Sequence, residues 1–404
     1  MAKVIVIGAG PAGIMAAITA SKNHEVILLD GNDRVGKKLF ITGKGRCNVT
    51  NAKDISEFFD YIYGNPHFLY SSLYSFTNED TIHFFENQGI KLKTERGGRI
   101  FPSSDKSSDI IKGLSNGLKE NNVQVKLNSK VTNILSKNDR ILGVEINNSQ
   151  KIIGDHFIIA TGGASYPLTG SKGDGYDFAK KLGHSIIDLK PSLVPIELNE
   201  KWLKELMGLS LKNISLSILK NNKVLYKEQG EMLFTSYGIS GPLVLKGSRF
   251  IKNDSSYTAL LDLKPALEIN ELDKRIQKDF LKYQNKEFKN SLNDLLPQKL
   301  IPLIIRLSGI PADKKVNVIT KDERKNLVYI IKNIKMNIKG LRPIEEAIVT
   351  AGGVNTLEID PSTMKSKLIS NLSFAGEVID VDAFTGGYNV QIAISTGYIA
   401  GNNI

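Results

Sequence analysis

The sequence has very little of what extracellular and membrane proteins depend on. Cys47 is the single cysteine in 404 residues, which excludes an internal disulfide and any CxxC redox pair. No stretch is apolar over the length that spans a bilayer. The first residues, MAKVIVIGAG, enter a strand-like run directly and lack the basic region and cleavage site of a signal peptide. We therefore expect a cytoplasmic protein without a membrane span.

The chain also lacks the patterns of metal sites and of serine hydrolases. Its five histidines show no ligand spacing, so no metal is expected. The segment GISGP does not place a serine between two glycines at the spacing of a nucleophile elbow.

A surplus of acid is lacking too, because the net charge is +11. The whole excess lies between Lys190 and Arg342, where 28 lysines and arginines face 16 aspartates and glutamates. A basic segment can bind nucleic acid, but these lysines are scattered among asparagines and acids and form no run with interleaved aromatic residues. We therefore expect a solvated lysine-rich surface and no nucleic-acid partner, with RNA binding as the alternative.

A strand, a glycine-rich turn and a helix open the chain. Lys3–Ile7 is an apolar run, GAGPAG follows at once, and a second apolar run ends at Asp30. This order is typical of a dinucleotide-binding βαβ unit, in which the glycines let a pyrophosphate approach the helix start and the acid binds ribose hydroxyls. The predicted cofactor contacts here are Gly8, Gly10, Pro11, Ala12, Gly13 and Asp30.

Two distant segments favour FAD over a nicotinamide dinucleotide. Asp155–Pro167 is a buried strand that runs into ATGG, and Leu372–Gly401 is a strand, a Gly-Glu pair and a Gly-Gly pair that opens an apolar helix. FAD is long, so its ribityl chain and ring need groups from such distant segments, and a helix N-terminus at the flavin stabilises negative charge on the reduced ring. The predicted contacts are Ala160, Thr161, Gly162, Gly376, Glu377, Gly387, Asn389 and Val390.

The residues between these anchors predict smaller elements and an insertion. Val123–Asn147 alternates like a β-meander, whose backbone near Val131 would contact adenine, and Thr77 is a plausible helix cap after a helical stretch at Asp54–Phe76. We expect an FAD domain at 1–189 and 343–404, interrupted by a substrate domain at 190–342 with a helical part at about 268–310.

Seven segments resemble, in order, the YhiN/BaiN-like flavoproteins, a family with aminoacetone oxidase and steroid enone reductase members. They are GAGPAG, GKKLFITGKGRCNVTN, GGRIFPSS, ATGGASYP, GISGP, TAGGVNTLEIDPSTMKSK and FAGEVIDVDAFTGGYNVQIAISTG. The resemblance implies an α/β fold, with a glutathione-reductase-type FAD-binding Rossmann domain, an inserted β-barrel and a small helical domain. The family often has histidine where this chain has Ser236.

The loop LFITGKGRCNVTN follows the ribose-binding acid and is predicted to run along FAD. Glycine permits the main chain to pass against the cofactor, and lysine, threonine and arginine can bond its oxygens. The predicted contacts are Lys38, Thr42, Gly43, Gly45, Arg46 and Cys47. We expect Cys47 to pack or contact FAD through its backbone, because free cysteines are usually buried and inert.

The expected reaction is hydride transfer between flavin N5 and a small organic substrate. A reductase that uses NAD(P)H as a transient donor is favoured, although no second G-x-G-x-x-G follows a strand. An oxygen-dependent amine oxidase acting on an aminoacetone-like substrate and an FAD-containing RNA-modifying protein are the alternatives. Candidate catalytic residues are Arg99, Tyr166, Tyr237, Tyr388 and Asn389, and the sequence leaves open whether the chain forms a homo-oligomer.

Overall fold

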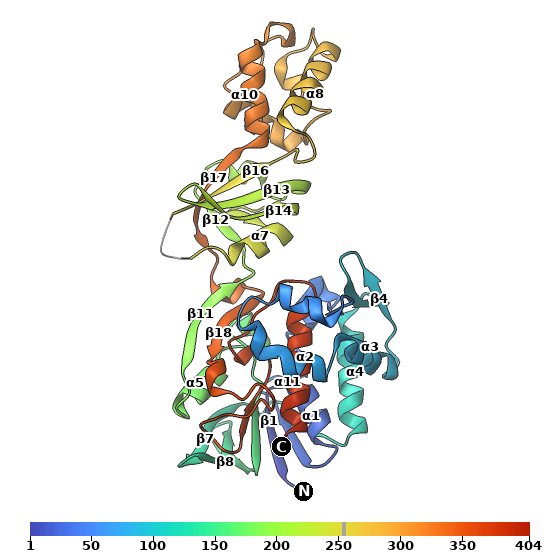
Figure 1. Ribbon diagram of the computed structural model, residues 1–404, viewed down its shortest axis with the longest axis vertical. Helices are drawn as coiled ribbons and strands as arrows, with labels where there is room; N and C mark the ends of the chain where they lie inside the picture. Colours follow the sequence, from blue (N-terminus) through green and yellow to red (C-terminus); the bar gives the residue numbers. More distant parts are fainter. Residues whose placement is uncertain (253–255) are drawn as a thin grey trace. The chain divides into compact units, whose positions relative to one another are not determined.

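The chain forms two compact units (Figure 1). The structure is a computed structural model that describes residues 1–252 and 256–404. Unit 1 comprises Met1–Ser192 and Ile344–Ile404, and unit 2 comprises Leu193–Pro343. From the sequence, the insertion was expected at 190–342. In the part of the chain that is described, no helix has the length and apolar character needed to cross a membrane.

Unit 1 is built on a five-stranded parallel sheet with the order β19-β10-β1-β2-β6. Its strands are β1 (Lys3–Ile7), β2 (Glu25–Leu29), β6 (Gln124–Lys126), β10 (His156–Ile159) and β19 (Leu372–Phe374). Strands β1 and β10 are nearly all buried, as expected for the centre of a parallel sheet covered on both faces. This is the predicted Rossmann sheet.

The first and last helices of the chain, α1 (Pro11–Ala20) and α11 (Tyr388–Asn402), pack side by side. A Cβ atom at Gly397 would lie 2.2 Å from the carbonyl oxygen of Ala12, and one at Gly401 would lie 2.3 Å from that of Ala16. Glycine therefore permits backbone-to-backbone packing of α11 on α1. This contact brings the C-terminal segment to the glycine-rich turn.

Three small antiparallel sheets complete unit 1. They are β7-β8-β9 (Val131–Lys137, Arg140–Ile146, Gln150–Ile153), β3-β5-β4 (Thr50–Asn51, Arg99–Pro102, Leu92–Glu95) and β11-β18 (Ile186–Ser192, Val349–Val354). The placement of residues 123–127 (VQVKL) at the start of the predicted β-meander was wrong, because β6 pairs in parallel with β2 at the edge of the main sheet. An alternating pattern fits an edge strand of either sheet, and only the long-range partner decides between them.

The helices of unit 1 agree in part with expectation. Thr77 caps α3 (Asn78–Asn87) in a capping box with Asp80, as predicted. The stretch expected to be helical over Asp54–Phe76 instead holds two 3₁₀ turns and the short helix α2 (Tyr70–Ser75). The other helices are α4 (Ser107–Glu120) and α5 (Asp174–Lys181).

Unit 2 is a closed six-stranded barrel with a helical lobe between its last two strands. The barrel order is β12 (Ile196–Leu198), β15 (Gly238–Ser240), β14 (Lys223–Phe234), β13 (Ser210–Lys220), β16 (Tyr257–Asp262) and β17 (Ile334–Leu341), with α6 (Leu203–Leu206) and α7 (Pro242–Ser248) beside it. The helical lobe, residues 269–332, contains α8 (Ile269–Lys282), α9 (Ile301–Ser308) and α10 (Lys321–Lys332), and so extends beyond the expected 268–310. Trp202 packs edge-on against Phe234, with ring centroids 6.0 Å apart.

Candidate functional site

The glycine-rich turn between β1 and α1 has the geometry of a phosphate cradle. Gly8 has a φ of +104°, and a Cβ there would lie 2.5 Å from the carbonyl oxygen of Ala160. A Cβ at Gly13 would lie 1.8 Å from the oxygen of Gly8, whereas one at Gly10 meets no atom within 4 Å. The space in front of Gly10 is therefore open beside the first turn of α1, whose N–H groups have no acceptor within the helix.

Asp30 lies just beyond β2, and its carboxylate is fixed against this turn. Its Oδ2 accepts a hydrogen bond from the backbone N–H of Ala9 at 2.7 Å, and its Oδ1 accepts from the backbone N–H and Nδ2 of Asn32 at 2.8 and 2.9 Å. A carboxylate has roughly four acceptor positions. Asp30 thus keeps acceptor capacity for the hydroxyls of a ribose.

A polar cluster joins three distant parts of unit 1. Lys38 Nζ lies 2.7 Å from Glu377 Oε2 and 2.7 Å from Ser165 Oγ, and the Ser165 hydroxyl donates to Glu377 Oε1 at 3.2 Å. Glu377 Oε1 also accepts from the backbone N–H of Thr350 at 2.9 Å. The structure therefore brings together Lys38 and Glu377, two residues predicted to bond the ribityl or phosphate oxygens of FAD.

The loop at residues 39–51, here called the Gly-Lys-Gly loop, has several residues in the left-handed region of backbone conformation. Gly43, Lys44, Gly45 and Cys47 all have φ between 57° and 82°, and two of these are not glycine. The Cys47 side chain is fully buried, and burial raises the pKa of its thiol to about 11, against a smaller opposing effect of a hydrogen bond with Thr42. A protonated buried thiol is a poor nucleophile, so the geometry agrees with a packing residue.

Arg46 is engaged by protein partners. Its guanidinium lies 2.8 Å from Glu95 and 3.2 Å from Asp105, and it stacks over the ring of Phe101 at 4.1 Å. Arg99, a catalytic candidate, lies 5.7 Å over the same ring and 3.8 Å from Glu95. These contacts tie the loop to the β4–β5 hairpin, and an Arg46 contact with pyrophosphate stays a prediction.

The start of α11 meets the end of the same loop. Gly387 has a φ of +99°, and a Cβ there would lie 2.3 Å from the carbonyl oxygen of Thr50. Asn389, predicted as a cofactor contact and catalytic candidate, uses its side chain locally: its Oδ1 accepts from the N–H of Ala383 and its Nδ2 donates to the Ala383 oxygen. Asn389 therefore shapes the turn that leads into α11.

Gln391 is a residue that the sequence reasoning missed. Its side chain is fully buried, its Oε1 accepts from the hydroxyl of Thr50 at 2.7 Å, and its Nε2 donates to the carbonyl oxygens of Phe76 and Thr77 at 3.1 and 3.0 Å. One amide thus holds the Gly-Lys-Gly loop, the start of α3 and α11 together. The motif GGYNVQIA carried the only signal, because a glutamine on a buried helix face needs partners.

Aromatic side chains pack around the first turn of α11. The ring of Tyr388 is buried, stacks on Tyr61 with centroids 4.6 Å apart and meets Phe58 edge-on at 4.9 Å. Burial raises the pKa of the Tyr388 phenol. Burial also raises the pKa of Tyr166, which follows Ser165 of the polar cluster. Both phenols are therefore protonated at neutral pH.

The remaining predicted residues are spread over both units. In unit 1, Val131 begins β7, residues Ala160, Thr161 and Gly162 follow β10, Gly376 follows β19, and Val390 lies in the first turn of α11. Tyr237 lies in unit 2, next to β15, where the guanidinium of Arg342 stacks on its ring at 4.6 Å. No group of His, Cys, Asp or Glu within residues 1–252 and 256–404 is arranged to hold a metal ion.

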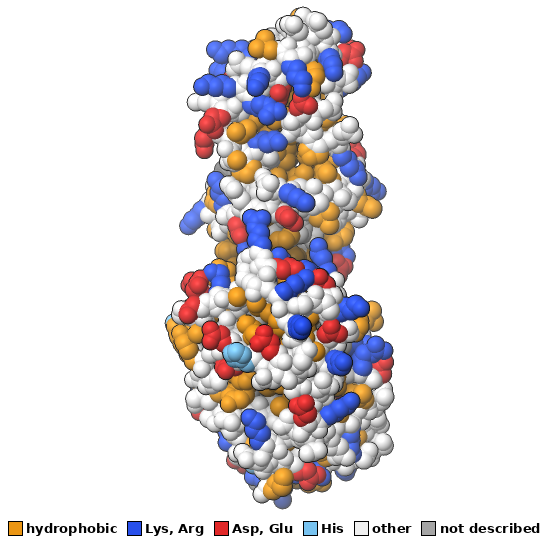
Figure 2. Space-filling model, turned by 90° about the vertical axis from the view of Figure 1, so that its right-hand side faces the viewer, with side chains coloured by type: hydrophobic (Ala, Val, Ile, Leu, Met, Phe, Trp, Pro, Cys, Tyr) orange, Lys and Arg blue, Asp and Glu red, His pale blue; other side chains and the backbone are white. Residues whose placement is uncertain are grey.

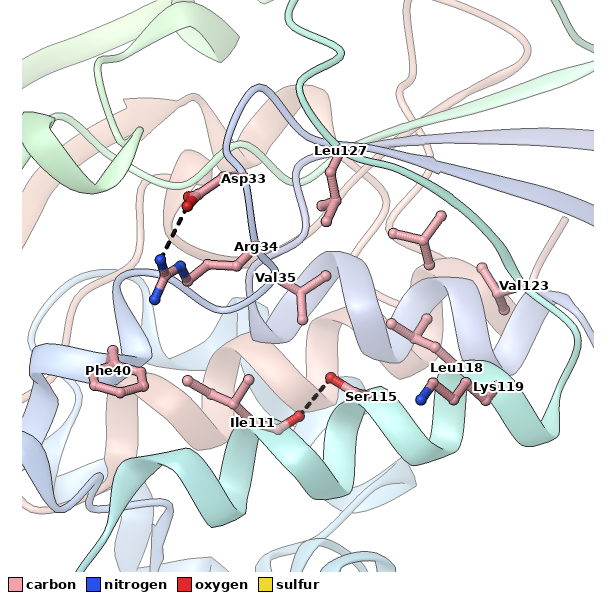
Figure 3. A pocket seen from close by; sticks show the side chains of 11 residues that line it. Asp33, Arg34, Val35, Phe40, Ile111, Ser115, Leu118, Lys119, Val123 and Leu127 are labelled. Carbon is pink, nitrogen blue, oxygen red and sulfur yellow. Dashed lines mark hydrogen bonds and ion pairs between the residues drawn. The ribbon is translucent and has the colours of Figure 1, made fainter.

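A cavity of about 350 Å³ lies between α4 and the strand β6 (Figure 3). Hydrophobic side chains such as Ile111 and Leu118 form most of its wall, and the Asp33–Arg34 ion pair lies beside it. None of the residues predicted to contact FAD lines it. It is separate from the phosphate cradle.

The residues present fit FAD at the cradle. The open space at Gly10, the oriented carboxylate of Asp30 and the polar cluster of Lys38 and Glu377 are the groups that a dinucleotide flavin needs along its length. In addition, the buried Oδ1 of Asn48 in the Gly-Lys-Gly loop has no hydrogen-bond partner within the described residues.

Comparison with known proteins places the chain in one family. Residues 2–403 match the model described as the HI0933-like protein Rossmann domain. The chain is 34% identical to the ribosomal RNA dihydrouridine synthase of Haemophilus influenzae, over 98% of this chain and 96% of the relative. It is 31% identical to the 3-dehydro-bile acid delta(4,6)-reductase of Clostridium scindens, over 99% and 98%.

Solved structures show the same fold at low identity. A 3-ketosteroid delta1-dehydrogenase from Sterolibacterium denitrificans aligns with a TM-score of 0.53 at 13% identity, over 99% of this chain and 98% of that one. A flavocytochrome c3 fumarate reductase aligns with a TM-score of 0.52 at 17% identity, over 100% and 78%. The resemblance to the YhiN/BaiN-like flavoproteins is thereby confirmed: the chain belongs to the HI0933-like family and is a flavin-dependent oxidoreductase with an FAD-type Rossmann fold.

Proposed function

We propose that the chain reduces a carbon–carbon double bond conjugated to a carbonyl, and that its substrate is a uracil base in RNA. The names of the two relatives support the reaction class. Dihydrouridine is uridine whose C5–C6 double bond has gained two hydrogens, and a 3-dehydro-Δ4,6 bile acid carries its double bonds next to a ketone. In both, a hydride can add to the carbon at the far end of the conjugated system.

The distribution of charge supports RNA over a steroid. Leu193–Pro343, which is unit 2, has 27 lysines and arginines against 16 aspartates and glutamates, while the rest of the chain is close to neutral. A polyanion is attracted to such a surface in a salt-dependent way, whereas a bile acid carries too little charge to use it. This concentration of positive charge is the observation that carries the proposal.

Unit 1 supplies the redox site in this proposal. The N-terminus of α1 and Asp30 would hold the adenosine half of FAD, Lys38 and Glu377 the ribityl region, and the start of α11 the ring. When bound, FAD supplies the hydride at its N5 atom and receives electrons from NAD(P)H. Tyr166, which follows Ser165 of the polar cluster, is the candidate proton donor to the other carbon in this proposal.

The test is anaerobic turnover of the FAD-loaded protein with NADH or NADPH and either ribosomal RNA transcribed without modification or a steroid enone. We expect the flavin to be reduced by one of the two nucleotides and uridine to gain the mass of two hydrogen atoms. Reduction of the enone alone would refute RNA as the substrate. If neither NADH nor NADPH reduces the flavin but aminoacetone does, the protein is an amine oxidase instead.

A further inference from the structure

The helical lobe of unit 2 is strongly basic. Residues 269–332 contain 14 lysines and arginines against 8 aspartates and glutamates. On the face of the molecule that Figure 2 shows, Lys and Arg side chains are spread over this unit and outnumber the acidic side chains among them.

Acidic partners neutralise part of this charge but leave two lysines of α10 without one. Arg324, for example, pairs with Asp273 of α8 at 2.7 Å. Lys321 and Lys325 are exposed, and no carboxylate of the described chain lies within ion-pair distance of either. The pKa of Asp273 is lowered mainly by its hydrogen bond with Arg324, and the charge of Lys325 adds to this lowering. Lys325 is therefore close enough to α8 for its charge to act on Asp273.

The same face of α10 carries an exposed aromatic ring. Tyr329 follows Lys325 by four residues and Lys321 by eight, so the three side chains form one stripe along the helix. The side chain of Tyr329 is 64% exposed, and its ring contacts no other aromatic ring or cation in the described residues. Two lysines followed by an aromatic residue are therefore present on one helical face, although they form no continuous run in the sequence.

We propose that the stripe formed by Lys321, Lys325 and Tyr329 binds RNA, with the lysines on backbone phosphates and the tyrosine stacked on an unpaired base. Charge complementarity selects this occupant, because two exposed ammonium groups without an ion-pair partner attract a polyanion. A planar exposed ring accepts any base on its face. This inference rests on the proposed function, since it assigns the surface that holds the RNA substrate.

The test measures binding of the FAD-loaded protein to a transcribed, unmodified ribosomal RNA fragment by fluorescence anisotropy over a series of salt concentrations. K321Q/K325Q should reduce the slope of log affinity against log salt by about two, since each phosphate contact contributes about one. Its affinity near physiological salt should fall roughly ten- to a hundredfold. Y329A should weaken binding by about fivefold or more and leave the slope unchanged.

A matched control removes the same charge from unit 1. K180Q/K181Q replaces two exposed lysines at the end of α5 and should leave both affinity and slope at the wild-type value. An unchanged slope in K321Q/K325Q, or an equal loss in K180Q/K181Q, overturns the proposed stripe. If the slope falls as expected but wild-type protein leaves uridine unreduced, the stripe stands and the proposed function fails. K321Q/K325Q and Y329A should still accept electrons from NAD(P)H, because the stripe lies outside unit 1, the unit proposed to hold the flavin.

Discussion

Replacement of Gln391 by leucine should destabilise unit 1 far more than a single polar-to-apolar change at the surface. The side chain makes three interactions with Thr50, Phe76 and Thr77 and a fourth with Ser395 at 3.0 Å. The carbonyls of Phe76 and Thr77 keep other donors, namely the Ser395 hydroxyl and the backbone N–H of Thr81. Within the described residues, the buried hydroxyl of Thr50 loses its only acceptor. The amide has only two N–H groups for its three acceptors, so it makes about three full hydrogen bonds in all. At about 1 kcal/mol each, and with about 1 kcal/mol more for the stranded hydroxyl, the loss is about 4 kcal/mol.

Urea unfolding followed by circular dichroism measures this loss, and bound flavin after purification reports its effect on the loop. Thr50→Val breaks only one of the bonds and should cost about 1–2 kcal/mol. The double variant should cost less than the sum of the two, because the stranded hydroxyl is gone. A Gln391→Leu protein within about 1 kcal/mol of wild type would refute the view that this amide joins the loop to α11.

Three further predictions concern the cofactor site and the core. Asp30→Ala and Gly10→Val should give folded but flavin-poor protein, since Gly10 has room for a side chain only where a phosphate would lie; normal flavin absorbance in both would contradict the cradle. Cys47→Ser should keep its flavin, and the native thiol should resist alkylation at pH 7, because burial raises the pKa of Cys47 to about 11; rapid alkylation of folded protein would argue for a reactive thiol. Burial lowers the pKa of His156 to about 4, below its ordinary value of 6.5. The free energy of unfolding is therefore highest above pH 6.5, where the imidazole is neutral in both states. It falls by about 2 kcal/mol by pH 5, because the unfolded chain takes up the proton and the folded protein does not. His156→Gln should flatten this pH dependence of the unfolding free energy, and an unaltered pH profile would show that other groups cause it.

The parts of the fold that were predictable are those specified by residues close together in the chain. The turn from Gly8 to Gly13 and the acid at Asp30 belong to one βαβ unit. Two of its glycines stand where a side chain would clash with nearby backbone, as a Cβ at Gly13 would with the carbonyl oxygen of Gly8. The cap at Thr77 is equally local, because its partner Asp80 is three residues away. The β-barrel was expected because seven longer motifs resemble a known flavoprotein family.

The features that escaped prediction depend on partners far away in the chain. Strand β6 alternates as any edge strand does, and its pairing with β2 spans about a hundred residues. A contact of Arg46 with the FAD pyrophosphate or with a substrate carboxylate stays a prediction, but no local pattern could indicate that Glu95 and Asp105 would flank its guanidinium. The lysines of α10 looked scattered in the sequence because residues on one helical face are four positions apart.

The position of the single tryptophan makes the two units optically distinct. Trp202 lies in unit 2 against Phe234, so all indole emission of this chain originates there. The flavin that unit 1 is proposed to bind absorbs and emits at longer wavelengths than indole. Its fluorescence changes when unit 1 unfolds and releases it. One heated sample therefore yields two independent melting curves, one for each unit. Coincident midpoints would mean that the insertion and its host unfold as one cooperative block, and separate midpoints would mean that the insertion melts as an autonomous module.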